Sequence, residues 1–265
     1  MYTAFATPFY FCKKKKKTIG PRYGYYANAK KTILVVKAAH IEKANQLFGD
    51  TDVQIAESGA RHLGAAIGDQ NFVRQYVEQK LQKWCSELKT LSDFSRTEPQ
   101  AAYSAFVFGF RGKWNFLQRT VPNCASLFQP LEDLMKTEFL PQLTGRALTD
   151  LERDLLSLPA REGGLGLSNP VETATTSFQD SHQITHELTL KIKAQDQCPS
   201  ECKVKEAKKQ AVQAKRRRER DKLAKLKQKV KDEHPQKKGE PHALKILESA
   251  TARCLLLADF SPSAR

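Results

Sequence analysis

A long amphipathic stretch that begins at Asp69 most constrains what this chain can fold into. Apolar side chains recur along it at three- and four-residue steps, the period of one face of a helix. They are Phe72, Val73, Tyr76, Val77, Leu81, Trp84, Leu88 and Leu91. Charged residues fill the positions between them, as on the solvent side of a packed helix. The pattern predicts one long helix whose apolar face is covered by other helices.

The segments that follow are predicted to supply those other helices. The sequence predicts further helices over about 99–122, over 127–139 ended by Pro141 and Gly145, and over 171–194. Pro99 is a residue type favoured in a first helical turn, and Thr149 with Glu152 has the spacing of a capping box. Five aromatic residues are predicted to form core, namely Trp84, Tyr103, Phe106, Phe110 and Trp114. The fold class is therefore mainly α, with a helical bundle at its centre.

A small β segment is expected before the bundle. The β-branched run from Thr32 to Val36 has strand length, and a short helix is predicted from His40 to Phe48, ended by Gly49. Two further short strands are predicted over 53–56 and 61–63, joined by a turn at Glu57-Ser58-Gly59.

For three candidate sites, the sequence favours a structural role over a functional one. The loop Gly163-Gly164-Leu165-Gly166 lacks the Gly-Lys-Ser/Thr ending of a phosphate-binding loop, so its glycines are expected to allow a tight turn and close packing. His182 and His186 lie four residues apart, but no third ligand is evident. Cys198 and Cys202 have no second pair nearby, which favours free thiols. The sequence predicts no metal site and no catalytic residue of its own.

Positive charge is concentrated in two short segments. The chain of 265 residues has a formal net charge of +15. Lys13–Lys17 contribute five lysines, and the stretch from Lys203 to Lys231 holds 14 Lys and Arg against three acidic residues. The rest of the chain is nearly neutral. A basic block of this kind attracts polyanions in a salt-sensitive and sequence-blind way, although a merely solvated helix has the same composition.

Composition also limits the compartment. No apolar run approaches the roughly 18 residues needed to cross a bilayer, six cysteines at irregular spacing give no disulfide framework, and no secretory signal is evident. An intracellular protein without membrane association is expected. The cluster Lys215-Arg216-Arg217-Arg218 is typical of nuclear import signals, which favours the nucleus over the cytoplasm.

The order of several short motifs resembles reverse transcriptases of invertebrate retrotransposons, over about residues 20–196. The motifs are Gly20-Pro21-Arg22-Tyr23-Gly24-Tyr25, Asn28-Ala29-Lys30-Lys31-Thr32, Arg61-His62-Leu63-Gly64, Ala101-Ala102-Tyr103, Gly112-Lys113-Trp114, Arg119-Thr120-Val121-Pro122-Asn123, the loop Gly163–Leu167 and Asn169-Pro170. The Asn-x-x-Lys-Thr segment resembles motif D at the end of the palm, and Leu63-Gly64 resembles the turn of motif E, the primer grip. The segments after them resemble the thumb.

The resemblance implies that the chain corresponds to the part of a polymerase after its catalytic centre. Such polymerases use two Mg²⁺ ions held by an aspartate of motif A and an Asp-Asp pair. This chain contains no Asp-Asp dipeptide, so no cofactor is expected here and the chain alone is expected to be inactive. By the same resemblance, Lys31 matches the motif D proton donor, with Lys30 beside it, and His62, Leu63 and Gly64 match the primer grip.

The sequence thus divides into a leader over 1–17, a palm remnant over 18–68, a thumb-like bundle over 69–196, a basic helix or linker over 197–241 and a short C-terminal helix over 242–265. The candidate nucleic-acid contacts are Lys30, Lys31, His62, Leu63, Gly64, Lys215, Arg216, Arg217, Arg218 and Arg220.

The main hypothesis is a non-catalytic fragment of a retroelement reverse transcriptase that binds RNA or an RNA/DNA duplex. A missing palm segment or another protein is a further expected partner. The alternatives are a basic helical scaffold that binds RNA or a protein, and a genomic fossil without selected function.

Overall fold

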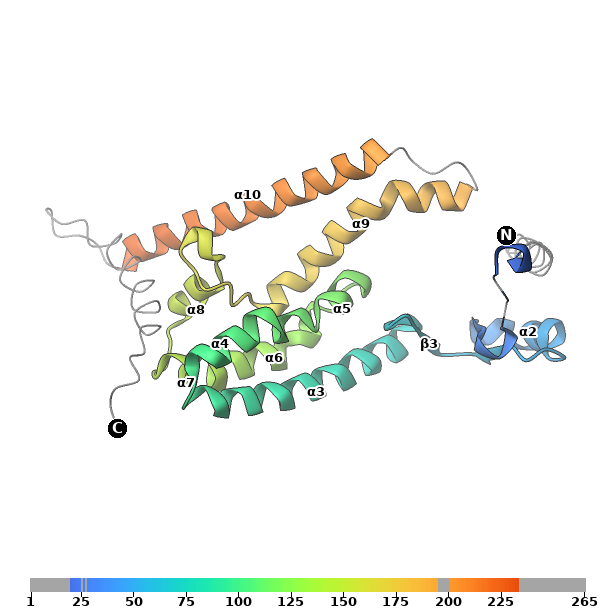
Figure 1. Ribbon diagram of the computed structural model, residues 1–265, viewed down its shortest axis with the longest axis horizontal. Helices are drawn as coiled ribbons and strands as arrows, with labels where there is room; N and C mark the ends of the chain where they lie inside the picture. The colour runs from blue at the N-terminus through green and yellow to red at the C-terminus, as the bar shows by residue number, and fades with distance from the viewer. Residues whose placement is uncertain (1–19, 25, 27, 195–200, 234–265) are drawn as a thin grey trace, which may run out of the picture. The chain divides into compact units, whose positions relative to one another are not determined.

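The computed structural model describes residues 20–24, 26, 28–194 and 201–233 (Figure 1). The predicted leader over 1–17, Cys198 and the predicted helix over 242–265 lie outside these residues. The chain divides into two compact units, Met1–Val73 and Arg74–Arg265. The described part is mainly helical, with two small sheets near its N-terminal end, which confirms the predicted fold class.

The first unit contains a two-stranded parallel sheet. Its strands are β1, Ile33–Val35, and β2, Gln54–Ala56, paired with Leu34 opposite Ile55. The connection between them runs through a 3-10 turn, η3 (Ala38–His40), and helix α2 (Ile41–Phe48), which ends at Gly49 as predicted. Two further 3-10 turns, η1 (Gly20–Tyr23) and η2 (Ala29–Lys31), precede β1.

The second sheet is a hairpin of strands β3 (Gly59–His62) and β4 (Ala65–Gly68), which pair antiparallel. The strands predicted over 53–56 and 61–63 overlap β2 and β3, whereas β4 was not predicted and Gly59, predicted in a turn, begins β3. The hairpin turn lies at Leu63 and Gly64, which have φ of 48° and 88°. Positive φ at both central residues gives the tight two-residue turn whose twist matches a hairpin. That turn brings Ala65 back beside His62.

The helical bundle begins with α3 (Gln70–Ser95), the long helix predicted from Asp69. The Asp69 carboxylate accepts a hydrogen bond from the Phe72 N–H at 2.7 Å and so caps the helix. Within the second unit, the α3 stripe of Val77, Leu81, Trp84 and Leu88 is buried. Around it lie α4 (Pro99–Phe108), η4 (Phe110–Gly112), α5 (Asn115–Thr120), η5 (Ala125–Phe128), α6 (Gln129–Leu134), the π-helical turn η6 (Met135–Phe139) and α7 (Leu140–Thr144).

An aromatic cluster fills the bundle core. The ring of Phe106 stacks on Phe139 with centroids 4.9 Å apart, and Phe110 meets Trp114 edge-on at 5.5 Å. Aromatic pairs in these geometries add to the free energy gained from burial. Of the predicted core aromatics, Trp84, Phe106, Phe110 and Trp114 are buried, which confirms the prediction, and Tyr103 is half-buried.

Two predicted helix boundaries are wrong. The helix predicted over 99–122 is interrupted after Phe108, where Gly109 leaves the helix and η4 follows. The helix predicted over 127–139, with Pro141 and Gly145 as its stops, continues through Pro141 to Thr144, and of the two predicted stops Gly145, with φ of 71°, ends it. The Leu140 N–H bonds to the Met135 carbonyl in a π-helical turn, and this local widening precedes Pro141, which has no N–H to donate.

The second unit continues with α8 (Asp150–Ser157), η7 (Ala160–Glu162), α9 (Pro170–Ala194) and α10 (Glu201–Glu233). The predicted capping box of Thr149 and Glu152 is present at the start of α8. Helix α10 runs back alongside α9 (Figure 1). A second small core joins it to α8 through Leu155, Leu158 and Leu226. The basic helix α10 is therefore packed against α8 and α9.

Candidate nucleic-acid interface

The inward side of α10 is held by ion pairs. Arg218 Nη2 lies 2.6 Å from Asp180 Oδ2 of α9. Lys222 Nζ lies 2.6 Å from Glu172 Oε2 of α9 and 3.8 Å from Asp154 Oδ1 of α8. Because the α9 partner moves toward the N-terminus as the α10 residue advances, the two helices are antiparallel. Arg218, a predicted nucleic-acid contact, is committed to this internal contact.

Small and apolar side chains complete the inward side of α10. Four small residues that recur at steps of three, four and three are at least half-buried, with Ala211 4% exposed; they are Val204, Ala207, Ala211 and Ala214. Further along, Leu226 and Val230 are buried. Alanine allows a close approach of the neighbouring backbone but contributes little apolar area. The ion pairs to α8 and α9 therefore contribute, together with this small apolar area, to holding α10 on the bundle.

An exposed side of α10 presents a line of cations. Lys209, Arg216, Arg220 and Lys227 follow one another at steps of seven, four and seven residues, which places them along one narrow line of the helix. All four side chains are exposed, and within the described residues none forms an ion pair. We call these four residues the outer stripe. Lys215 and Arg217, also predicted contacts, are exposed.

This charge arrangement is one-sided. Helix α10 places paired cations against α8 and α9 and unpaired cations toward solvent. Among the described residues of α10, the exposed carboxylates are Glu206, Asp221 and Asp232, fewer than the exposed cations around them. A surface of this kind has a positive potential that attracts polyanions.

The predicted motif D residues lie at the entrance to β1. The Asn28 carbonyl accepts hydrogen bonds from the Lys31 N–H at 3.3 Å and from the Thr32 hydroxyl at 2.9 Å. The Gln54 side chain donates to the Lys30 carbonyl at 3.2 Å and ties this turn to β2. Both lysine side chains are exposed. The structure therefore places two cations at the mouth of the strand, held by a fixed backbone turn.

The predicted primer-grip residues lie on the other small sheet. His62 ends β3, and Leu63 is 85% exposed at the tip of the hairpin with Gly64. The β1–β2 sheet with Lys31 and the β3–β4 hairpin with Leu63 are separate sheets of the first unit. The basic residues of α10 belong to the second unit. The predicted contacts thus occupy three separate places on the chain.

The glycine-rich loop has no free backbone donors for a phosphate. The N–H groups of residues 163–167 donate to the carbonyls of Ala160, Pro159, Leu156, Leu158 and again Leu156 in turn. Gly163 and Gly166 have φ of 84° and 69°, and a side chain at Gly164 would collide with Leu158. The predicted structural role of these glycines is confirmed.

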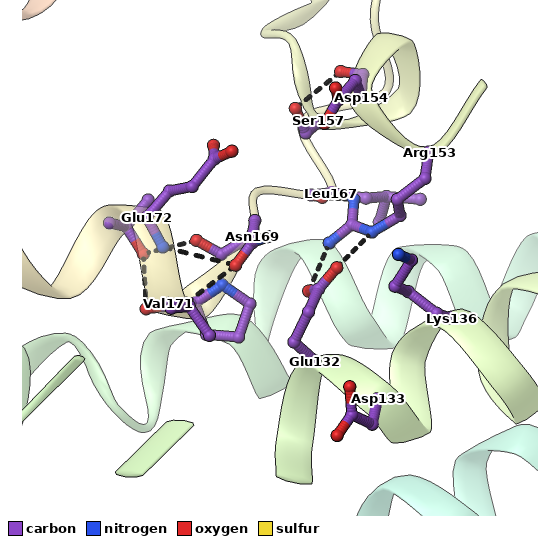
Figure 2. Close-up of polar contacts among 12 residues, drawn as sticks. Glu132, Asp133, Lys136, Arg153, Asp154, Ser157, Leu167, Asn169, Val171 and Glu172 are labelled. Carbon is purple, nitrogen blue, oxygen red and sulfur yellow. Dashed lines mark hydrogen bonds and ion pairs between the residues drawn. The ribbon is translucent and has the colours of Figure 1, made fainter. Parts of the chain in front are cut away.

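Three side chains bind successive carbonyls of this loop, an arrangement the sequence did not indicate. Tyr103 donates to the Leu165 carbonyl at 2.9 Å, and Arg111 donates to the Gly166 carbonyl at 2.8 Å. Arg153 donates to the next carbonyl, Leu167, at 2.6 Å, and its remaining nitrogens bind Glu132 (Figure 2). Burial raises the pKa of Tyr103, which favours the protonated form that donates this hydrogen bond. The loop is a structural joint between α4, η4, α8 and α9.

The histidine pair and the cysteines do not form a metal or nucleophilic site within the described residues. His182 and His186 are exposed with ring centroids 5.7 Å apart, and no group of three metal-ligating side chains occurs in this part of the chain. Burial raises the pKa of the Cys85 and Cys124 thiols, which lowers their thiolate fraction. Across the described helices, none is both long and apolar enough to span a membrane. Comparison with protein-family models, curated proteins and solved structures found no match to this chain.

Proposed function

We propose that this chain is a non-catalytic, reverse transcriptase-like module that binds nucleic acid through the outer face of α10. The observation that carries the proposal is the division of cations on that helix. Arg218 and Lys222 are neutralised by carboxylates of α8 and α9. Arg216 and Arg220, close to them in sequence, are exposed and free of such partners in the described part of the chain.

This division supports binding because an unpaired cation costs little to bring to a phosphate. A paired cation would first have to leave its carboxylate, whereas the outer stripe has only solvent and counterions to release. Counterion release from the nucleic acid supplies most of the affinity of such contacts and makes it depend on salt. The docked helix also holds the four cations in fixed order, which limits the conformational entropy lost on binding.

A charge-matched comparison tests the proposal. The four outer-stripe residues Lys209, Arg216, Arg220 and Lys227 are replaced by Gln in the full chain. A control variant replaces four exposed cations elsewhere, Lys43, Lys83, Lys89 and Arg119, and so has the same net charge. Binding to a fluorescent 16-bp duplex is measured by anisotropy at several salt concentrations.

The outer-stripe variant is expected to lose affinity by about 100-fold at 0.1 M salt and to lower the slope of log K against log salt by about 3 to 4. The control is expected to keep the wild-type slope. Equal losses in the two variants would show that net charge alone drives binding and would overturn the assignment to α10.

The polymerase-related part of the proposal rests on Lys31 and on the Leu63–Gly64 turn, whose residues and order resemble motifs D and E. If these segments keep a role on a primed template, Lys31→Ala in the outer-stripe variant should reduce residual binding to a primer–template further. No further reduction would instead favour the alternative, a basic scaffold without polymerase ancestry. Lys37→Ala, an exposed lysine after β1, is the matched control.

We further propose that the chain resides in the nucleus. Lys215, Arg216 and Arg217 are exposed and adjacent, as a nuclear import signal requires, although Arg218 is turned inward. A fluorescent fusion with all three replaced by Gln should shift toward the cytoplasm, whereas the wild-type fusion should accumulate in the nucleus. Equal distribution of both would overturn this assignment.

A further inference from the structure

The outer stripe has a fixed length and direction. From Lys209 to Lys227 it covers 18 helical steps, about 27 Å at 1.5 Å per residue. Ala211, Leu226 and Val230 on the inward side are buried, and ion pairs to α8 and α9 lie between them. The stripe therefore presents its cations as a straight, preformed array.

The outer side of α10 has cations but no aromatic side chains. From Glu201 to Glu233 the helix contains no Phe, Tyr or Trp, so it offers no aromatic platform on which unpaired bases could stack. Another side of α10 is packed against α8 and α9, so only its outward side chains can meet a ligand. What remains accessible are cations suited to phosphate oxygens, which fix position but carry no sequence information.

We infer that the outer face of α10 selects double-stranded over single-stranded nucleic acid by linear charge density, without regard to base sequence, sugar or strand ends. This inference rests on the proposed function. A duplex carries one charge per about 1.7 Å of its axis, compared with 3.4 Å for each of its strands, and it holds its phosphates in place. A straight array meets such a ligand at several phosphates at once, whereas a flexible strand must be ordered along the array first.

The test compares four probes on the full chain with Lys31→Ala, so that the contact proposed for a primed template does not add to the binding by α10, by fluorescence anisotropy between 50 and 300 mM salt. They are a blunt 16-bp DNA duplex, an RNA–DNA hybrid of the same sequence, a primer–template with a recessed 3′ end, and the unstructured single strand dT16. The first two differ in sugar and helix form, the third adds a strand end, and the fourth removes the second strand. A scrambled duplex of equal composition controls for sequence.

The duplex probes are expected to bind within about threefold of one another. The dT16 strand is expected to bind at least tenfold more weakly at 0.1 M salt, with a shallower salt slope. Binding of dT16 as tight as that of the duplex, or a preference above threefold for the recessed end or for one sequence, would overturn the inference. If the outer-stripe variant also loses affinity in that case, the proposed function stands. If that variant binds every probe like the wild type, the proposed function fails instead.

Discussion

Glu132 and Arg153 form a two-point ion pair in the interior of the second unit (Figure 2). Arg153 Nε donates to Glu132 Oε1 at 2.8 Å and Nη2 donates to Oε2 at 2.7 Å, with both side chains buried. The third nitrogen of the guanidinium binds the Leu167 carbonyl. One arginine thus joins α6, α8 and the glycine-rich loop, and the charges are compensated on both sides.

Removing one member of this pair should destabilise the bundle strongly. Glu132→Gln would leave the buried Arg153 without a counter-charge, and breaking a buried pair in this way costs about 3 to 5 kcal/mol. Chemical denaturation followed by circular dichroism measures the change in the free energy of unfolding. The neighbouring Asp133→Asn alters an exposed carboxylate and should change that free energy by less than about 0.5 kcal/mol. Similar effects of both substitutions would contradict the compensating role of the pair.

The glycine-rich loop allows a second stability test. An alanine at Gly164 would place its Cβ against the carbonyl group and the Cβ of Leu158, and the carbonyl belongs to the backbone and cannot easily move aside. We expect a loss of about 3 kcal/mol in the free energy of unfolding. Gly112→Ala meets open space and has no positive φ, so its expected change is near zero. A thermal shift assay on the two variants reads the difference directly, and a tolerated alanine at Gly164 would show that the loop packs more loosely than described.

The capping box predicts a dependence on acid. Arg146 beside Glu152, together with hydrogen bonds from Thr149, lowers the pKa of the Glu152 carboxyl from 4.5 to about 2. A carboxyl whose pKa is lower in the folded state stabilises it fully above pH 4.5 and loses this contribution as the pH falls toward 2. Glu152→Gln should therefore cost about 1 to 2 kcal/mol at pH 7, because the pair is partly solvated.

The same reasoning fixes the shape of the pH profile. The difference in unfolding free energy between the wild type and Glu152→Gln should shrink between pH 5 and pH 2.5. Denaturant titrations of both proteins at several pH values measure it. A difference that stays constant over this range would show that the cost arises from the lost cap hydrogen bonds alone.

The absence of an Asp-Asp dipeptide makes a prediction about activity. Purified chain given a primed template, all four deoxynucleotides and Mg²⁺ or Mn²⁺ is expected to extend no primer above background, because two-metal phosphoryl transfer needs closely placed carboxylates. A gel-based extension assay with an intact reverse transcriptase as positive control measures this. Heat-labile extension by the clean protein would overturn the non-catalytic assignment.

Sequence patterns predicted the elements whose signals are local. The apolar stripe from Phe72, the cap at Thr149 and the stop at Gly49 each involve residues within a few turns of one another, so spacing alone identifies them. Strand β4 escaped prediction although a turn at Leu63-Gly64 was expected from the resemblance, because Ala65–Gly68 holds only one β-branched residue, Ile67, and has no strand pattern of its own. The Glu132–Arg153 pair joins residues 21 positions apart, and no periodicity links them.

The orientation of the basic helix could not be predicted from local sequence either. In the basic segment nearly every position is polar, so little apolar contrast marks which side of the helix faces the bundle. The orientation of Arg218 depends on Asp180, which lies 38 residues earlier on another helix. Sequence therefore predicted the presence of a basic helix, whereas the division into inward and outward cations required the packing of α9.

That division makes Arg216 and Arg218 a matched pair of probes, two residues apart and equal in charge. Arg218→Gln leaves the Asp180 carboxylate without its partner and should lower the free energy of unfolding by about 0.5 to 1 kcal/mol, since the ion pair is partly exposed. For duplex binding by Arg218→Gln, the slope of log K against log salt should stay at the wild-type value. Arg216→Gln should leave stability unchanged, weaken duplex binding by about threefold to tenfold at 0.1 M salt and reduce the slope by about 1. Denaturation and anisotropy on the same two preparations separate these effects. Exchanged behaviour, with Arg218→Gln altering the slope and Arg216→Gln altering stability, would contradict the orientation of α10.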